Sequence, residues 1–120
     1  MKKKRRVVFW LYCCISVIFV MSIEEFNETL QDSKPNPSWS IQLQALWFEA
    51  KGDWTTGHDL IDHLGDRRSA RVHAFFHRVE GDLWNARYWY RQADEAEYLG
   101  DLTEERQYLI QQFIAEEREK

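Results

Sequence analysis

The sequence predicts an all-α protein: two antiparallel helical hairpins and a C-terminal capping helix, preceded by a single N-terminal transmembrane helix or signal segment. Three observations lead to this fold class. Apolar residues recur with a period of 3.6 residues through most of the region 38–117. Gly-Asp pairs at 52–53 and 81–82 each separate two such stretches, as turns between helices do. The two halves match at an offset of 29 residues, which indicates a helical repeat.

The first 23 residues have the composition of a membrane anchor or a secretory signal. Five basic residues at 2–6 precede an uncharged apolar run, 7–23, which as a helix would span about 25 Å, the lower limit for a bilayer core. Because a basic cluster stays cytoplasmic, we expect a single-pass membrane protein whose C-terminal domain lies on the non-cytoplasmic side. A cleaved signal would instead release a secreted or periplasmic protein, and a cytoplasmic chain is the third alternative.

The charge of the remaining chain is acidic. Residues 2–6 hold five of the 16 basic residues, so the rest carries 11 basic against 20 acidic residues, a net charge of −9. This balance argues against nucleic acid as a partner. The only cysteines, Cys13 and Cys14, lie inside the apolar run and indicate neither a disulfide framework nor a metal site.

Residues 24–37 are predicted to form a short juxtamembrane helix and a linker. Phe26 and Leu30 continue the apolar residues at helical spacing, among glutamates. Pro35 and Pro37 then disfavour helix. We therefore expect the helical repeat domain to occupy residues 38–120.

The first hairpin is expected to begin at Ser38, a candidate N-cap for a helix that ends near Lys51. This helix is apolar on more than one side, as a helix between two neighbours is. Gly52 and Asp53 are the predicted turn residues. The helix after them has an apolar stripe that consists of Trp54, Gly57, Ile61 and Leu64.

The second hairpin is expected over residues 70–93. The stripe of its first helix consists of Val72, Phe75, Phe76 and Val79. Gly81 supplies the left-handed conformation that commonly ends a helix, and Asp82 can cap the next one. The stripe of that next helix consists of Leu83, Ala86, Tyr90 and Ala93. Small residues at the equivalent positions 57 and 86 allow close helix approach, in the style of tetratricopeptide repeats, although those have a longer period of about 34 residues.

The capping helix is predicted from residue 102 to about 117. Asp101 followed by Glu104 suggests a capping box at its start. The residues expected to face inward are Leu102, Leu109, Ile110, Phe113 and Ile114.

Residues 47–93 resemble an uncharacterised family of small bacterial all-helical proteins. The pattern that carries the resemblance is His-Ala-x-x-His-Arg-x-Glu-Gly-Asp-x-x-Asn-Ala-x-Tyr-Trp-Tyr-Arg, which here covers residues 73–91. A weaker match precedes it at Gly52-Asp53-Trp54 and at Gly57-His58, where Gly57 replaces the usual Ala. The resemblance implies a helical fold and no specific activity.

Three histidines are candidates for a metal site. His73 and His77 are one helical turn apart, a spacing that can chelate a transition metal, and His58 can approach them across the hairpin. With Glu80 or Asp82 nearby, they would suit zinc or another divalent metal, in a metal-dependent or acid–base enzyme. The zinc protease motif is excluded because Ala74 occupies the place of its catalytic glutamate. The structural alternative is that the imidazoles fix helix packing by hydrogen bonds, in which case no cofactor is present.

Four residues near the end of the second hairpin form a candidate binding surface: Trp84, Arg87, Tyr88 and Arg91. Arginine and aromatic side chains together are typical of binding hot spots. The alternative is internal: the arginines would pair with nearby carboxylates, and the aromatic rings would pack under the last helix. Phosphate-binding loops and nucleophile elbows are missing from the sequence. We therefore expect a membrane-tethered helical-repeat module that binds a protein partner, rather than an enzyme.

Overall fold

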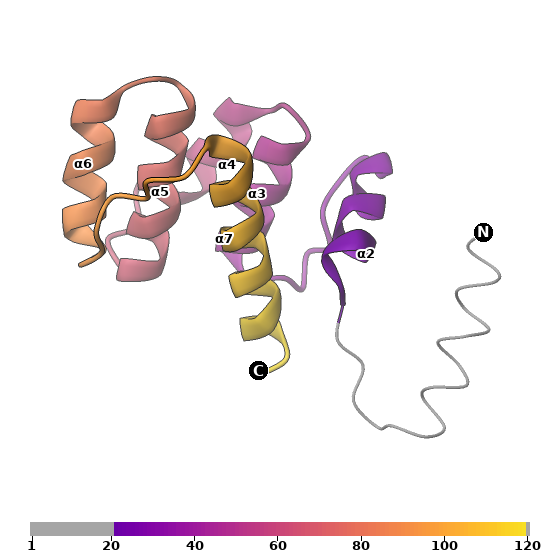
Figure 1. Ribbon diagram of the computed structural model, residues 1–120. Coiled ribbons are helices and arrows are strands. Elements are labelled where there is room, and N and C mark those ends of the chain that lie inside the picture. Colours follow the sequence, from indigo (N-terminus) through magenta and orange to yellow (C-terminus); the bar gives the residue numbers. More distant parts are fainter. Residues whose placement is uncertain (1–20, 120) are drawn as a thin grey trace, which may run out of the picture.

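The computed structural model describes residues 21–119, and this part of the chain is entirely helical, as predicted. Its helices run along an elongated body, with α2 at one end and α6 at the other (Figure 1). A short 3₁₀ helix, Thr29–Gln31, follows α2. The α-helices are α2 (Ile23–Glu28), α3 (Ile41–Ala50), α4 (Trp54–Ile61), α5 (Arg67–Val79), α6 (Leu83–Gln92) and α7 (Leu102–Glu117).

Each helix from α4 to α7 begins directly after a Gly-Asp pair. The aspartate is the N-cap in all four cases, and its carboxylate accepts a hydrogen bond from the backbone N–H three residues later. Three of these caps, Asp53, Asp82 and Asp101, lie at positions that the sequence analysis identified. The fourth, Asp66, has the same local signal after Gly65.

The turns before α4 and α6 share one geometry. Gly52 and Gly81 have φ angles of +94° and +86°, a conformation that strains any residue with a Cβ atom. The next N–H donates back across the turn in both cases, from Asp53 to Phe48 O at 2.8 Å and from Asp82 to His77 O at 2.9 Å. These two turns are 29 residues apart.

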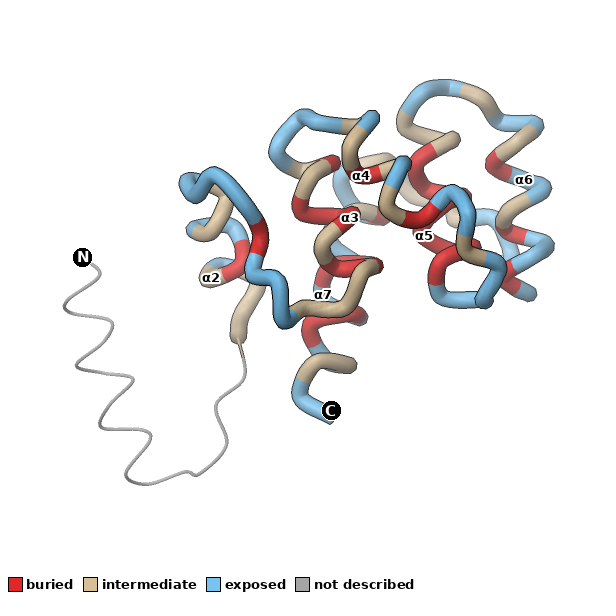
Figure 2. The backbone as a smooth tube through the Cα atoms, turned by 180° about the vertical axis from the view of Figure 1, so that it is seen from behind, coloured by how far each residue is buried: buried red, intermediate tan, exposed pale blue. Residues whose placement is uncertain are grey.

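The main hydrophobic core lies between α3, α5 and α7, where buried positions concentrate (Figure 2). Gly57 brings α4 close to this core. A Cβ atom at position 57 would lie 2.7 Å from Ala45 O and 2.8 Å from the ring of Phe76. A second, smaller cluster between α5 and α6 consists of Ala74, Ala86 and Tyr90.

Two details differ from the sequence predictions. The N-cap of α3 is Ser40 rather than Ser38, because Trp39 leaves the helical path and stacks on Phe26 at 5.5 Å between ring centroids. Leu83 was expected in the buried stripe of α6 but is half exposed, since it is the first residue of α6, directly after the turn. The remaining members of that stripe, Ala86, Tyr90 and Ala93, are buried.

The folded body begins before the predicted boundary at residue 38. Phe26 of α2 is fully buried in the main core, and α2 packs against α7. Lys51 Nζ also donates hydrogen bonds to the backbone carbonyls of Leu30 and Asp32, which ties the segment after α2 to the end of α3.

The predicted membrane segment, residues 7–23, falls almost entirely outside the described residues. Within residues 21–119, every helix is too short or too polar to cross a membrane.

Candidate docking surface and histidine cluster

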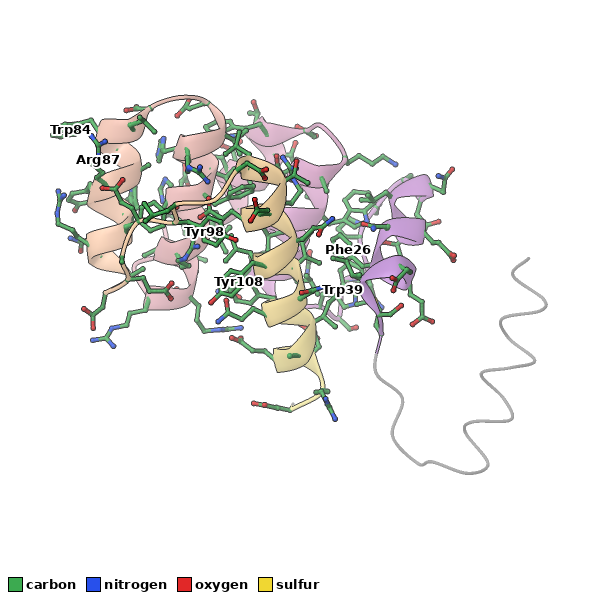
Figure 3. All side chains as sticks on the ribbon, viewed as in Figure 1. Phe26, Trp39, Trp84, Arg87, Tyr98 and Tyr108 are labelled. Carbon is green, nitrogen blue, oxygen red and sulfur yellow. The ribbon has the colours of Figure 1, made fainter. Side chains whose placement is uncertain are left out.

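Helix α6 presents the four predicted binding residues, Trp84, Arg87, Tyr88 and Arg91, on one side, since they are spaced by three or four residues. All four are exposed. Trp84, 75% exposed, and Arg87 point away from the body at the end opposite Phe26 (Figure 3). We call these four residues with Leu83 the α6 face. Three of the five large apolar residues exposed in the described part of the chain belong to it, so apolar surface is concentrated there.

The charges of the α6 face are only partly neutralised within the described residues. Arg87 Nε lies 3.0 Å from Glu97 Oε2, and both side chains are about half exposed. Arg91 has no carboxylate within ion-pair distance in the region 21–119. The face therefore carries positive charge on a body whose overall charge is negative.

The internal alternative holds in part for Arg87, which pairs with Glu97, and more fully for Arg71 and Arg78. The latter two flank Glu105 of α7, whose carboxylate is fully buried: Arg71 Nη1 lies 2.8 Å from Oε2, and Arg78 Nη1 donates to Oε1 at 2.6 Å. The Tyr90 hydroxyl donates to Oε2 as well, at 2.5 Å. Burial, followed by this hydrogen bond, raises the pKa of Tyr90.

Glu105 was not identified from the sequence, although a signal for it exists. Positions 105, 109 and 113 are four residues apart, so they share one side of α7, and Leu109 and Phe113 are buried. A carboxylate on an apolar side of a helix needs buried partners. The sequence does not say which partners these are, because they come from α5 and α6.

The three candidate histidines meet at the contact between α4 and α5. His58 Nε2 lies 3.0 Å from His73 Nε2. One nitrogen from each of His58, His73 and His77 lies within 4.8 Å of the other two. His58 comes from the second helix of the first hairpin and meets His73 and His77 on the first helix of the second hairpin, the three residues that the sequence analysis grouped.

Carboxylates lie beside two of these imidazoles on the side away from the shared centre. His77 Nδ1 lies 2.6 Å from Glu80 Oε1, and because a carboxylate only accepts, Nδ1 carries the hydrogen. His58 Nδ1 lies 3.8 Å from Asp62 Oδ2. His73 Nδ1 is buried without a hydrogen-bond partner among the described residues. His63 is largely exposed, and its Nδ1 lies 3.5 Å from Asp62 Oδ1.

Burial keeps His58 and His73 neutral at pH 7. It lowers the pKa of His73 to about 4, with further effects from His77 and His58, and it lowers the pKa of His58 in the same direction. Tryptophan rings cover both imidazoles: Trp54 stacks on His58 at 4.5 Å, and Trp89 stacks on His73 at 4.0 Å between centroids. Neutral, oriented imidazoles can accept a hydrogen bond or bind a metal ion.

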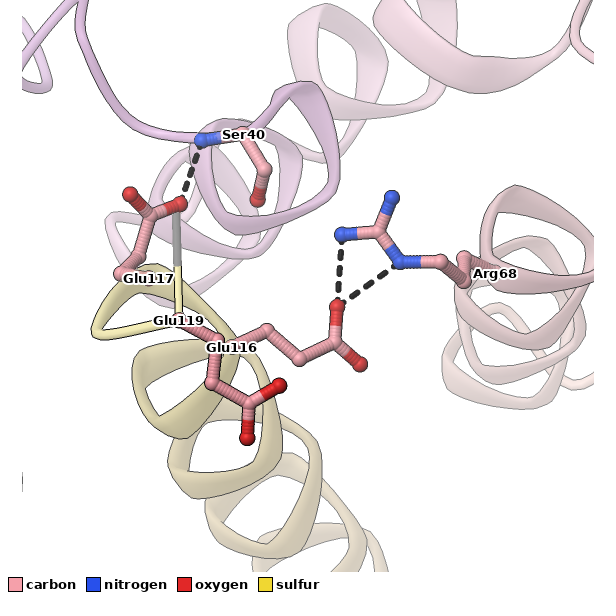
Figure 4. Close-up of a pocket in the computed structure, with 5 residues that line it drawn as sticks. All are labelled: Ser40, Arg68, Glu116, Glu117 and Glu119. Carbon is pink, nitrogen blue, oxygen red and sulfur yellow. Dashed lines mark hydrogen bonds and ion pairs between the residues drawn. The ribbon is translucent and has the colours of Figure 1, made fainter.

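A surface pocket lies where the end of α7 meets α3 and α5 (Figure 4). Ser40 N donates to Glu117 Oε2 at 2.6 Å, and Arg68 Nε donates to Glu116 Oε1 at 2.8 Å. Because these groups bind one another, they attach the end of α7 to the body, and the pocket does not offer a site for a ligand.

Comparison of the chain with family models, with curated proteins and with solved structures finds no match. The resemblance of residues 47–93 to a bacterial helical family therefore stays a prediction, and the function must be argued from the α6 face and the histidine cluster.

Proposed function

We propose that this protein is a membrane-tethered helical-repeat module that binds an amphipathic, acidic helix of a partner protein on the α6 face. The two hairpins, α3–α4 and α5–α6, would be the repeats, in the style of tetratricopeptide repeats, and α7 would be the cap. The observation that carries the proposal is the α6 face itself: an exposed Trp84 with Tyr88, Arg87 and Arg91 on one side of a terminal helix.

The position of α6 favours a helix as the ligand. Helix α6 packs mainly against α5, and its outer side has no helical neighbour in the described part of the chain. In a stack of hairpins, the next hairpin covers this side. A partner helix laid there would bury the aromatic side chains in the way that α5 buries Ala86 and Tyr90.

The charges favour an acidic partner. Arg91 is available for a carboxylate, and the exposed pair between Arg87 and Glu97 contributes only about 0–1 kcal/mol, so it can be exchanged for a pair with the partner. Arginine binds carboxylates in a bidentate manner, which would fix the register of the partner helix.

Site-specific photo-crosslinking in cells tests the proposal. A photoreactive amino acid replaces Trp84 in the full chain, and mass spectrometry identifies the crosslinked peptide. We expect one protein, crosslinked through a segment with apolar residues at helical spacing and carboxylates beside them. The double substitution Arg87→Glu, Arg91→Glu should reduce the crosslink yield at least tenfold, because each arginine at a hot spot contributes about 2 kcal/mol.

Tyr108 provides the matched control, since it is an exposed aromatic residue on α7, away from the α6 face. A photoreactive group at position 108 should not capture the same peptide. Three results would contradict the proposal: crosslinks from position 84 to lipid, crosslinks to a second copy of this chain, or the same set of proteins from positions 84 and 108.

A further inference from the structure

We propose that His58, His73 and His77 form a three-histidine site for a divalent zinc ion, which links α4 to α5. The site is separate from the α6 face and does not depend on the proposed docking function.

The donor geometry is close to that of a zinc site. Two imidazole nitrogens bound to one tetrahedral zinc ion, each at about 2.0–2.1 Å, are about 3.3 Å apart. The Nε2 atoms of His58 and His73 are 3.0 Å apart, and all three donor nitrogens lie within 4.8 Å of one another. A small adjustment of side-chain torsions, without movement of a helix, would bring the three donors to equal distances from one ion.

The neighbouring carboxylates support the same nitrogens as ligands. Metal-binding histidines usually donate their other N–H to a carboxylate, which fixes the tautomer and the ring orientation. Glu80 has this position relative to His77 Nδ1, and Asp62 lies on the Nδ1 side of His58. This leaves Nε2 as the nitrogen that His58 and His77 can each offer to an ion.

His73 is the buried member of the three histidines. Its side chain is 4% exposed, yet Nδ1 has no hydrogen-bond partner among the described residues, whereas buried polar atoms normally have one. In a purely structural role, His73 would be satisfied on one side only, by Nε2 of His58. A metal ion at Nε2 would replace that single hydrogen bond with a stronger interaction at the same nitrogen, while Nδ1 would stay without a partner.

The donor set selects the metal. Imidazoles without thiolates suit Zn²⁺ and its divalent neighbours, whereas Mg²⁺ and Ca²⁺ require oxygen ligands. Three protein donors leave one tetrahedral position for water or another ligand. Since His58 comes from α4 and the other two from α5, the ion would hold together the two hairpins, so zinc should stabilise the fold.

Metal titration of the full chain in detergent micelles tests the inference. Co²⁺ serves as the spectroscopic probe, and Zn²⁺ competes with it. We expect one Co²⁺ per chain with the visible absorption bands of four-coordinate cobalt, and loss of these bands when one equivalent of Zn²⁺ is added. Zn²⁺ should also change the emission of the stacked Trp54 and Trp89 and raise the melting temperature.

His58→Gln and His77→Gln are the test variants, because both side chains are partly exposed, whereas His73 is buried. Each should weaken zinc binding at least about 100-fold, more than the loss of an outer-shell partner does. His63→Gln is the matched control, an exposed histidine next to the site, and should bind zinc like the unsubstituted protein. The inference is wrong if the full chain binds no stoichiometric zinc, or if both test variants bind zinc as tightly as the unsubstituted protein. It is also wrong if His63→Gln loses as much zinc affinity as the test variants do. In these cases the imidazoles serve only in packing.

Discussion

At the scale of single residues, Glu105 is a polar side chain on which the stability of the core depends. Its carboxylate is fully buried and is neutralised by Arg71 and Arg78, with the hydroxyl of Tyr90 as a third partner. These partners come from α5 and α6, so this one carboxylate connects α7 to the second hairpin. A buried ion pair adds little compared with a hydrophobic substitute, but removal of one partner leaves an uncompensated charge.

We therefore predict that Glu105→Ala lowers the free energy of unfolding by about 3–5 kcal/mol, because it leaves the buried guanidinium of Arg71 with the half-exposed Glu95 as its remaining carboxylate partner and removes the acceptor of the Tyr90 hydroxyl. Urea unfolding followed by circular dichroism measures this value. Glu97→Ala is the control, since it removes the exposed partner of Arg87 and should cost at most about 1 kcal/mol. Equal losses in the two variants would contradict the assigned role of Glu105.

Residue-level prediction from sequence succeeded where the cause is local. Asp82 and Asp101 cap helices because each carboxylate bonds an N–H three residues away, a distance the sequence itself specifies. The partners of Glu105 and the meeting of His58 with His73 depend on how whole helices are placed. Sequence spacing indicated that His73 and His77 share one side of a helix, whereas the grouping of His58 with them rested on the expected packing of the hairpins.

At the scale of secondary-structure elements, the approach of α4 to its neighbours depends on Gly57. A methyl group there would lie 2.7 Å from the carbonyl oxygen of Ala45, a backbone atom that cannot move away freely. Glycine at this helical position costs about 1 kcal/mol in intrinsic propensity relative to alanine, so close packing must offset that cost.

We predict that Gly57→Ala destabilises the protein by about 1–3 kcal/mol despite the better helix propensity of alanine, because overpacking outweighs it. Thermal and urea unfolding measure the change. Gly65→Ala is the matched control: a Cβ atom at position 65 meets nothing within 4 Å, and stability should stay the same or rise by up to about 1 kcal/mol. If both variants were equally stable, close approach of α4 would not limit the residue at position 57.

The helix boundaries show why the helices were predicted more accurately than the segments that connect them. The starts of α4, α6 and α7 follow from Gly-Asp pairs, which act locally. The N-cap of α3 is Ser40 and not the predicted Ser38, because Trp39 packs against Phe26, which precedes α3 in another element. Residues 31–37 were expected to be a stiff linker before the folded domain, yet Pro35 is buried, and α2 before it packs against α7.

At the scale of the whole molecule, the two ends of the elongated body differ. At one end, α2 and Trp39 cover the core, with Phe26 fully buried (Figure 3). At the other end, the α6 face lies open to solvent. A stack of hairpins needs its ends covered, so the covered end should determine stability, and the open end is free to bind. The sequence predicted the helices but not this asymmetry, because Phe26 was assigned to a segment outside the domain.

This asymmetry leads to a comparison of two large aromatic residues at opposite ends. Phe26→Ala should lower the free energy of unfolding by about 3–5 kcal/mol, because it leaves a cavity in the main core. Trp84→Ala should change it by no more than about 0.5 kcal/mol, since that ring is mostly exposed. Hydrogen exchange locates the effects: amides of α2 and α3 should exchange faster in Phe26→Ala, whereas those of α6 should be unchanged in Trp84→Ala. If Trp84→Ala were as destabilising as Phe26→Ala, the aromatic residues of α6 would have a structural role. A lower crosslink yield from position 84 could then not be attributed to the loss of a docked partner.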